Sequence, residues 1–320
     1  MREKIAVLMG GRSLEREVSL ASGRRVCDAL VAAGYYVLGL DVTADLVSTL
    51  RSERPNAAYI ALHGKYGEDG TIQELLEFLG IPYTGPGVVS CALSWDKSVT
   101  KHRLAEKGLP TPEWVTLTAD AFKEMGAATA LDLIPEAVGG FPVAVKPGRQ
   151  GSALGFRRVD SADELADAML TALSFDTSVI VERWIEGTEL AISVLGAGDD
   201  ARVLPPVEIV PTHGLYDFDA RMNPGEADFF APARITPEAA RRASEVARAV
   251  HVALDCRDVS RVDMMLDAEG NPWALECNTS PGMTETSLLP MAAEAADMSF
   301  QDVVSQLIQA ALLRSSESGK

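Results

Sequence analysis

The chain has 320 residues, of which 47% are hydrophobic and 23% charged, so it is long enough for two or three domains with sizeable cores. Its 46 acidic residues against 29 basic ones give a net charge of −17, which argues against a protein that binds nucleic acid or a membrane surface. The four cysteines form no Cys-x-x-Cys pair and the N-terminus lacks the pattern of a signal peptide, so we expect a cytoplasmic protein with free thiols.

The first part of the chain alternates apolar runs, glycine turns and helical patterns. KIAVLMGG at 4–11 predicts a strand, and apolar side chains recur at helical spacing over 13–34. NAAYIALHG at 56–64 predicts another strand, followed by a helix over 71–80. Strands that alternate with helices form parallel sheets, so we predict a Rossmann-like α/β domain over residues 1–95 with ligand loops at the carboxyl ends of its strands.

The middle of the chain predicts a second, smaller domain over residues 96–187. It opens with a helical pattern at 96–108, which the LPTP segment at 109–112 must end because proline cannot continue a helix. Two apolar runs in this domain predict strands, at 142–147 and 178–184. Between them, SADELADAMLTAL predicts a helix that begins with a capping box of Ser161 and Glu164.

Residues 188–320 predict a third domain. Its longest helix runs over 236–254, where Thr236 is placed to cap the helix and Pro237 takes the first helical position. SRVDMMLDAEGNPWALECN at 260–278 reads as two strands joined by a DAEGN turn, which is a β-hairpin signal.

Polar residues interrupt the second strand of this hairpin. Side chains alternate faces along a strand, so Arg261 shares a face with Asp263, and Glu276 shares a face with Asn278. The turn brings Asp263 opposite Glu276, and two carboxylates that close repel unless a cation lies between them. Hard oxygen ligands select Mg²⁺ or Mn²⁺, so we predict a metal site at Asp263, Glu276 and Asn278. The alternative is a solvated edge strand with scattered acids.

A metal of this kind usually works with phosphates, and AVKPGRQGSALGF at 144–156 is suited to them. Lys146 ends a strand, and the glycines after it let backbone N–H groups face an anion. The loop is not a P-loop, because its lysine precedes the glycines, and GGRSLE near the N-terminus does not match a dinucleotide fingerprint. Farther along, the 179–184 stretch is suited to line an adenine ring, and Glu189 to accept bonds from ribose hydroxyls.

Several of these segments together resemble one family, the D-alanine–D-alanine ligases of the ATP-grasp superfamily. The matching segments occur in family order and cover nearly the whole chain: VLMGGRSLEREVSLASG, ALHGKYGEDGTIQ, PYTGPGVVSCALSWDK, VKPGRQGSALG, YDFDAR, FFAPA, RVDMML and LECNTSPGMTETSLLPM. The resemblance implies a three-lobed ATP-grasp fold, of the α/β (α+β) class. It also implies a homodimer.

The resemblance implies an activity as well. Two D-alanine molecules are joined with ATP through an acyl phosphate, which gives ADP, phosphate and a dipeptide for peptidoglycan. Activation is needed because a free carboxylate is a poor electrophile, and positioning with charge neutralisation does most of the work.

Site residues follow from the same resemblance. It implies ATP contacts at Lys97, Lys146, Glu182, Trp184, Glu189 and Arg221. It implies ligands of two Mg²⁺ or Mn²⁺ ions at Asp263, Glu276 and Asn278. It implies catalytic or D-alanine-binding roles at Glu15, His63, Ser152, Arg261, Gly282 and Ser287. Among these, Glu15 would hold the first ammonium group, Arg261 and the Gly282 N–H the reacting carbonyl, and Ser287 the second carboxylate.

The chain departs from the family at Arg221-Met222, where Lys-Tyr is usual. Arginine can replace lysine at a phosphate, although its donors form a planar fork. The family's tyrosine hydroxyl bonds to the counterparts of Ser152 and Glu15, whereas the thioether of methionine is at best a weak acceptor. We therefore keep one alternative, a ligase with an altered second substrate such as D-lactate or another D-amino acid.

Two further classes compete with a ligase. In a non-catalytic nucleotide-binding regulator the site would have decayed, which the intact set of Lys146, Arg261, Asp263, Glu276 and Asn278 argues against. A dehydrogenase would bind a nicotinamide cofactor, and the absent dinucleotide fingerprint argues against it.

Overall fold

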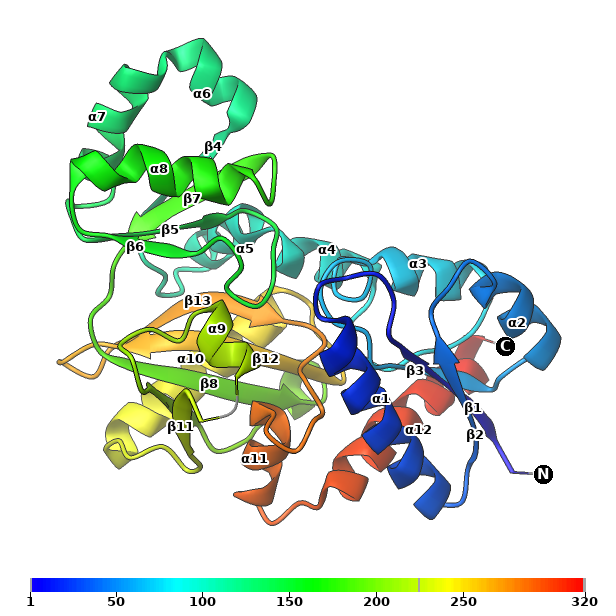
Figure 1. Ribbon diagram of the computed structural model, residues 1–320. Coiled ribbons are helices and arrows are strands. Elements are labelled where there is room, and N and C mark those ends of the chain that lie inside the picture. Colours follow the sequence, from blue (N-terminus) through cyan, green and yellow to red (C-terminus); the bar gives the residue numbers. More distant parts are fainter. Residues whose placement is uncertain (1, 224, 319–320) are drawn as a thin grey trace.

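The computed structural model describes residues 2–223 and 225–318, which form three groups of strands and helices (Figure 1). The first group is built on a parallel sheet with the strand order β2-β1-β3, which confirms the predicted α/β unit. Its elements are β1 (Lys4–Met9), α1 (Arg16–Ala32), β2 (Tyr36–Asp41), α2 (Leu46–Glu53), β3 (Ala57–Ile60), α3 (Thr71–Phe78) and α4 (Val88–Trp95).

Alternation along β1 divides its buried side chains between two cores. Ile5 and Val7 pack on one side in a core that includes Leu30 of α1, and Ala6 and Leu8 pack on the other side in a core shared with α2 and α3. The first core also takes Val304, Leu307 and Ile308 from the C-terminal helix α12 (Phe300–Ser318). The end of the chain therefore helps to build its beginning (Figure 1).

The second group is a small antiparallel sheet with the order β4-β7-β5-β6, drawn at the top of Figure 1. Val143, Val145 and Val181 of this sheet share a core with Leu165 and Met169 of its helices. The glycine-rich loop joins β5 to β6, as the sequence predicts. The elements are β4 (Trp114–Thr118), α6 (Ala119–Met125), α7 (Ala127–Ala137), β5 (Val143–Pro147), β6 (Arg157–Val159), α8 (Ala162–Leu173) and β7 (Ser178–Arg183).

The predicted capping box of α8 is wrong, because neither of its two bonds forms. Ser161 stands at the N-cap, but its side chain caps no helix N–H. The Glu164 carboxylate instead accepts a bond from the Asp160 N–H at 3.2 Å, one residue before the expected donor. Because the donor to Glu164 is one residue earlier in the chain than expected, the two reciprocal bonds of a capping box do not form.

The third group is an antiparallel sheet with the path β11-β10-β8-β12-β13, to which β9 is added beside β8. Helix α10 covers one face, where Leu190 and Val262 meet Ala243 and Val250. The other face joins the core that contains β1, α11 and α12. The elements are β8 (Thr188–Leu195), β9 (Arg202–Val203), β10 (Val207–Pro211), α9 (Phe218–Met222), β11 (Ala227–Phe230), α10 (Pro237–Ala253), β12 (Val259–Leu266), β13 (Pro272–Asn278) and α11 (Leu288–Glu294).

Helix α5 (Lys97–Glu106) connects the first group to the others. Its side chain Leu104 is fully buried in the core beneath α10, so this helix packs on the third sheet. The domain boundaries predicted at 95/96 and 187/188 remain proposals. In α10, the hydroxyl of Thr236 accepts a bond from the Ala239 N–H at 3.2 Å and Pro237 begins the helix, which confirms the predicted start.

No helix within residues 2–223 and 225–318 is long and apolar enough to cross a membrane. In the same part of the chain, the four cysteines are all free thiols.

Asp258 ties three distant segments together. Its carboxylate accepts two bonds from the Arg314 guanidinium, at 2.8 and 2.7 Å, and one from the Gly85 N–H at 2.9 Å. Arg314 also donates to the Tyr83 carbonyl at 2.6 Å. Helix α12, the loop after β3 and the start of β12 are therefore held by one buried carboxylate.

We predict that Asp258→Ala lowers the free energy of unfolding by about 3 kcal/mol, because it leaves the Arg314 cation without this buried counter-charge. Denaturant unfolding followed by circular dichroism measures the change. The matched control is Arg241→Ala on α10, which breaks ion pairs to Glu238 and Glu245 that lie in solvent. Equal losses in the two variants would contradict the role given to Asp258.

Candidate functional site

Two adjoining cavities lie where the three groups meet. The first, about 320 Å³, is lined by the second and third sheets, and the second, about 580 Å³, is lined by the first group, the glycine-rich loop and the ends of β12 and β13. They share a wall formed by Lys97, Gln150, Tyr216, Arg221 and Glu276. Every site residue expected from the sequence lines at least one of them: Glu15, His63, Lys97, Lys146, Ser152, Glu182, Trp184, Glu189, Arg221, Arg261, Asp263, Glu276, Asn278, Gly282 and Ser287.

The hairpin β12–β13 has the predicted register. Asp263 pairs with Glu276 and Arg261 pairs with Asn278, so the four side chains form two neighbouring cross-strand pairs. Asp263 faces the first cavity, Arg261 the second, and Glu276 lines both. The strand pair is therefore the partition between the two cavities.

Each carboxylate of this pair has a cation from the chain itself. Arg261 holds Asp263 in a bidentate ion pair, with Nε–Oδ1 at 2.6 Å and Nη2–Oδ2 at 2.7 Å. Lys97 Nζ lies 3.2 Å from Glu276 Oε2 and also donates to the Gln150 carbonyl at 2.6 Å. Burial raises the pKa of Glu276, but Lys97, Arg221 and Lys146 outweigh it and hold that pKa at about 2.

The arrangement fits a divalent cation that also binds phosphate. Within residues 2–223 and 225–318, no group of three or more His, Cys, Asp and Glu side chains could hold a metal by itself. The predicted set has two carboxylates and an amide, all oxygen donors on one wall, and Mg²⁺ commonly completes such a set with phosphate oxygens. Asn278 Oδ1 accepts a bond from the Ser280 N–H at 2.8 Å, which orients the amide and leaves a second lone pair.

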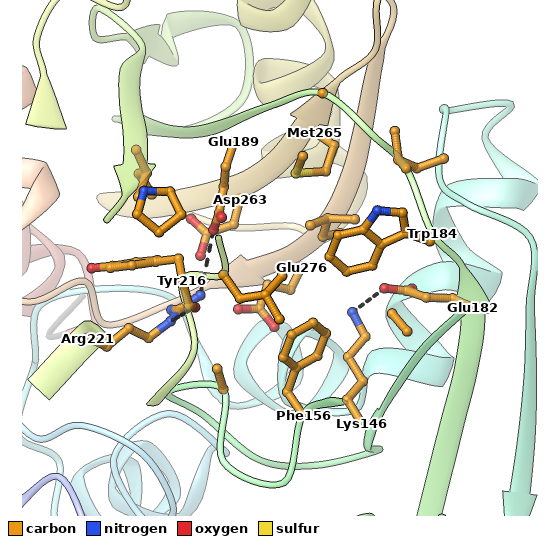
Figure 2. Close-up of a pocket in the computed structure, with 18 of the residues that line it drawn as sticks. Lys146, Phe156, Glu182, Trp184, Glu189, Tyr216, Arg221, Asp263, Met265 and Glu276 are labelled. Carbon is orange, nitrogen blue, oxygen red and sulfur yellow. Dashed lines mark hydrogen bonds and ion pairs between the residues drawn. The ribbon is translucent and has the colours of Figure 1, made fainter. Parts of the chain in front are cut away.

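A buried carboxylate stands between two lysines at the far side of the first cavity. Glu182 forms an ion pair with Lys146, visible in Figure 2, and a second one with Lys101 at 2.8 Å. Lys101 is fully buried and also donates to Thr111 Oγ1 at 2.7 Å. Burial raises the pKa of Glu182, but the two lysines lower it further, so this carboxylate is ionised.

Aromatic rings form one wall of the first cavity. Phe156 and Trp184 are stacked, with their ring centres 6.3 Å apart, and lie beside Lys146 and Glu182 (Figure 2). Glu189 lies across the cavity from them, next to Asp263. Burial raises the pKa of Glu189 to about 7, although Arg221 opposes the shift. A flat apolar slot with carboxylates at its ends suits a purine nucleoside.

Arg221 closes the cavity on the side of α9. Its guanidinium lies 4.6 Å from the centre of the Tyr216 ring, and its Nη2 lies 3.9 Å from Glu189 Oε1 (Figure 2). Its contact with the ATP phosphates, which the family resemblance implies, remains a prediction. The side chain of Met222, on which the predicted departure from the family depends, lies outside the described part of the structure.

Glu15 enters the second cavity from the start of α1. Its carboxylate accepts a bond from Ser152 Oγ at 2.6 Å, so the glycine-rich loop is joined to the first group of elements. Two glycines make room for it: a Cβ on Gly151 would lie 2.6 Å from Glu15 Oε1, and one on Gly64 would collide with Oε2. Burial raises the pKa of Glu15 while bonds from Ser152 and Ser13 lower it.

His63 is fixed on both ring nitrogens. Ser22 Oγ accepts a bond from the Met283 N–H at 3.1 Å, so its own proton goes to His63 Nε2 at 3.0 Å. The ring proton is then on Nδ1, which donates to the Ser280 carbonyl at 3.0 Å. Burial lowers the pKa of His63 to about 4, so the ring is neutral and serves as a brace for the wall.

Gly282 and Ser287 lie at the other end of the second cavity. Ser287 Oγ accepts a bond from the Thr284 N–H at 3.0 Å and lies 2.8 Å from the Thr284 hydroxyl. A Cβ on Gly282 would lie 2.6 Å from Ser287 Oγ, so glycine keeps this turn close to the hydroxyl. A carboxylate bound by Ser287 would therefore lie next to the Gly282 backbone.

Two ionisable residues of the site, Lys101 and Glu68, were not expected from the sequence. Lys101 lies one turn after Lys97 on the same face of α5, a spacing that was visible in the sequence. Glu68 lies in GKYGEDG, a segment used for the resemblance, but its burial in the second cavity depends on packing that a sequence does not display.

Known proteins match the chain over nearly its whole length. Two family models match, "D-ala D-ala ligase N-terminus" over residues 43–86 and "D-ala D-ala ligase C-terminus" over residues 104–309. A D-alanine–D-alanine ligase from Pelotomaculum thermopropionicum is 43% identical over 313 residues, which cover 98% of either chain.

Solved structures match the fold. A D-alanine–D-alanine ligase from Bacillus anthracis in complex with ATP is 31% identical, with a TM-score of 0.83 and 99% of both chains covered. A D-Ala:D-Ser ligase from Enterococcus faecalis is 30% identical, also with a TM-score of 0.83, over 97% of this chain and 99% of that one.

We predict that Lys101→Met lowers the free energy of unfolding by about 2 to 3 kcal/mol, since Glu182 then keeps only one of its two buried cations. Thermal or denaturant unfolding measures the loss. Lys123→Met is the matched control, because Lys123 pairs with Asp120 in solvent, where its side chain is 75% exposed. If both variants have the same free energy of unfolding as the parent protein, the buried ion pair of Lys101 with Glu182 does not stabilise the fold.

Proposed function

Because this chain belongs to the D-alanine–D-alanine ligase family, we propose that it uses ATP to join two D-alanine molecules. The products are D-alanyl-D-alanine, ADP and phosphate, and the dipeptide is a precursor of peptidoglycan. One observation carries the proposal: two adjoining cavities share a wall of paired carboxylates and cations, so a nucleotide in one can phosphorylate an acid in the other.

The first cavity is the proposed ATP site. The rings of Phe156 and Trp184 face the adenine, and the Glu182 carboxylate accepts from its exocyclic amine. Glu189 accepts bonds from the ribose hydroxyls. The phosphates then point toward the shared wall, where the cations Lys97 and Arg221 lie, and Lys146 lines the same cavity.

Asp263, Glu276 and Asn278 are the proposed ligands of two Mg²⁺ or Mn²⁺ ions. Such ions would neutralise phosphate charge and make the γ-phosphorus a better electrophile. The pairing of Arg261 with Asp263 and of Lys97 with Glu276 keeps the carboxylates oriented toward the wall.

The second cavity is the proposed D-alanine site. Glu15, held by Ser152, binds the ammonium group of the first D-alanine and directs its carboxylate at the γ-phosphate. The product of this step is an acyl phosphate. Ser287 binds the carboxylate of the second D-alanine, whose amine then attacks the activated carbonyl.

Arg261 and the Gly282 N–H stabilise the oxygen that becomes negative during this attack. Arg261 is suited to the task because Asp263 fixes its guanidinium through two bonds, so no reorganisation is needed when charge develops. His63 contributes as a brace, since both of its nitrogens are occupied.

The comparisons do not favour the alternative of an altered second substrate. The family models and the curated relative are those of D-alanine–D-alanine ligases, while one structural neighbour is named for D-serine. Two further expectations rest on the family resemblance: a homodimer and a cytoplasmic location.

The assay that tests the proposal is ADP release with mass identification of the product. We expect ADP only when ATP, Mg²⁺ and D-alanine are all present, and D-alanyl-D-alanine as the product. Removal of divalent metal with a chelator should abolish turnover, and added Mg²⁺ or Mn²⁺ should restore it. D-Lactate and D-serine as second substrates test acceptor choice, and preferential formation of either mixed product would overturn the assignment to D-alanine.

The Glu15→Gln variant tests whether the two cavities bind different substrates. Loss of a charged partner for the first ammonium group costs about 1.5 to 3 kcal/mol, so we expect the KM for D-alanine to rise roughly 10- to 100-fold. The KM for ATP should not change, because Glu15 lines only the second cavity. Steady-state kinetics in both substrates measure the two constants, and a parallel rise in the KM for ATP would contradict the division.

A further inference from the structure

Glu68 is a carboxyl group of the second cavity to which no role has been given. Its side chain is buried and lines the same cavity as Glu15, Arg261, Gly282 and Ser287. Its backbone N–H donates to the Gly64 carbonyl at 2.9 Å, and its backbone carbonyl accepts a bond from Thr279 Oγ1 at 3.3 Å. The group is therefore held between the loop after β3 and the end of β13.

The neighbouring side chain, His63, does not compensate the negative charge of an ionised Glu68. His63 Nδ1 lies 3.9 Å from Glu68 Oε1, but its proton is directed to the Ser280 carbonyl and the ring is neutral. The cations of the site are engaged elsewhere, because Arg261 holds Asp263 and Lys97 holds Glu276. Glu68 is thus a buried acid with weak compensation.

The proposed reaction needs a proton acceptor in this cavity. An amino acid in water carries an ammonium group, which has no lone pair and cannot attack a carbonyl. Among the other carboxylates that line the cavity, Glu15 binds the first ammonium group, Glu276 faces the metal and phosphates, and Glu17 is exposed to solvent.

We propose that Glu68 is the general base that removes a proton from the ammonium group of the second D-alanine. The proton passes to a carboxylate oxygen of Glu68, and the lone pair that is released forms the bond from nitrogen to the carbonyl carbon. The carbon–oxygen bond to the phosphoryl group then breaks, and phosphate leaves with that electron pair. The proton that nitrogen loses when the amide forms leaves with the phosphate.

The surroundings give Glu68 a suitable basicity. Burial raises its pKa to about 8, with Glu15 adding to the shift and the Gly64 N–H and Arg261 opposing it. A base that titrates close to the working pH is the most effective one for proton transfer. The ionisable groups that face it come from several elements: Glu15, His63, Cys91, Arg261 and Glu276.

This inference rests on the proposed ligase function, and the test separates the two. Acyl phosphate forms from D-alanine and ATP, and hydroxylamine is added to compete with D-alanine as the acceptor. Hydroxylamine is uncharged at neutral pH, so it can attack without losing a proton first, and it yields D-alanine hydroxamate. Dipeptide and hydroxamate are measured by mass at several pH values, with ADP release as the common readout.

For Glu68→Gln we expect dipeptide formation to fall at least about 100-fold, the usual contribution of a positioned base. Hydroxamate formation should be unchanged, because the first step does not use Glu68. In the parent protein the ratio of dipeptide to hydroxamate should rise with pH through about 8, the pKa of Glu68, because only its ionised form accepts a proton. In Glu68→Gln the ratio should be lower and should follow the amount of free D-alanine amine in solution, which keeps rising with pH and does not level off above about 8.

Two further variants serve as controls. Glu74→Gln removes the same charge from the exposed side of α3 and should behave as the parent protein. Glu68→Asp keeps the acid with a shorter reach and should retain part of the dipeptide activity. If Glu68→Gln does not fold, Glu68→Asp decides: a loss of dipeptide with hydroxamate unchanged supports the proposal, and dipeptide at the parent rate overturns it.

The proposal is overturned if Glu68→Gln forms dipeptide at the parent rate, or if it loses hydroxamate and dipeptide equally. The second result would place Glu68 in the first step. A flat ratio in the parent protein would also overturn it. If the parent protein and Glu74→Gln release no ADP with D-alanine, the proposed function itself fails, and this outcome is distinct from the others.

Discussion

Acidic side chains on two neighbouring strands are tolerable only if cations lie beside them, and this constraint organises the whole site. Asp263 and Glu276 face each other across β12 and β13, and each is matched by a cation of the chain. Arg261 comes from the same strand as Asp263, while Lys97 comes from α5. Because Lys97 also bonds to Gln150, the same cation fastens the glycine-rich loop to the acidic strand pair.

The strand pair also separates the groups suited to a nucleotide from the groups suited to amino acids. Nucleotide-binding features lie on one side of it, where Glu182 is set between Lys146 and Lys101. Groups suited to amino acids lie on the other side, where Glu15 reaches across to Ser152. Since the cavities share this wall, a phosphoryl group and its acceptor can meet there without either substrate leaving its own cavity. The buried acids and their counter-ions are thus more informative about function than the largest apolar cores.

Much of this arrangement is local and was predictable from the sequence. Glycine turns after apolar runs predicted the parallel sheet, and the alternation of side chains with a DAEGN turn predicted the register of Asp263 with Glu276. The unpredicted features depend on distant packing. Helix α12 completes the core of the first sheet, and Lys101 and Glu68 acquire their environments only when separate elements pack together. The predicted cap at Ser161 was wrong for a local reason: Glu164 bonds to the N–H of Asp160, one residue earlier, and the sequence does not show this difference.

The most direct measurement of the central claim is a crystal structure with Mg²⁺ and a non-hydrolysable ATP analogue. We expect ions with oxygens of Asp263, Glu276 and Asn278 at about 2.1 Å and phosphate oxygens in the remaining positions. We also expect adenine between the rings of the first cavity and the Glu182 carboxylate. Nucleotide bound elsewhere, or ions that leave these three side chains uncoordinated, would contradict it.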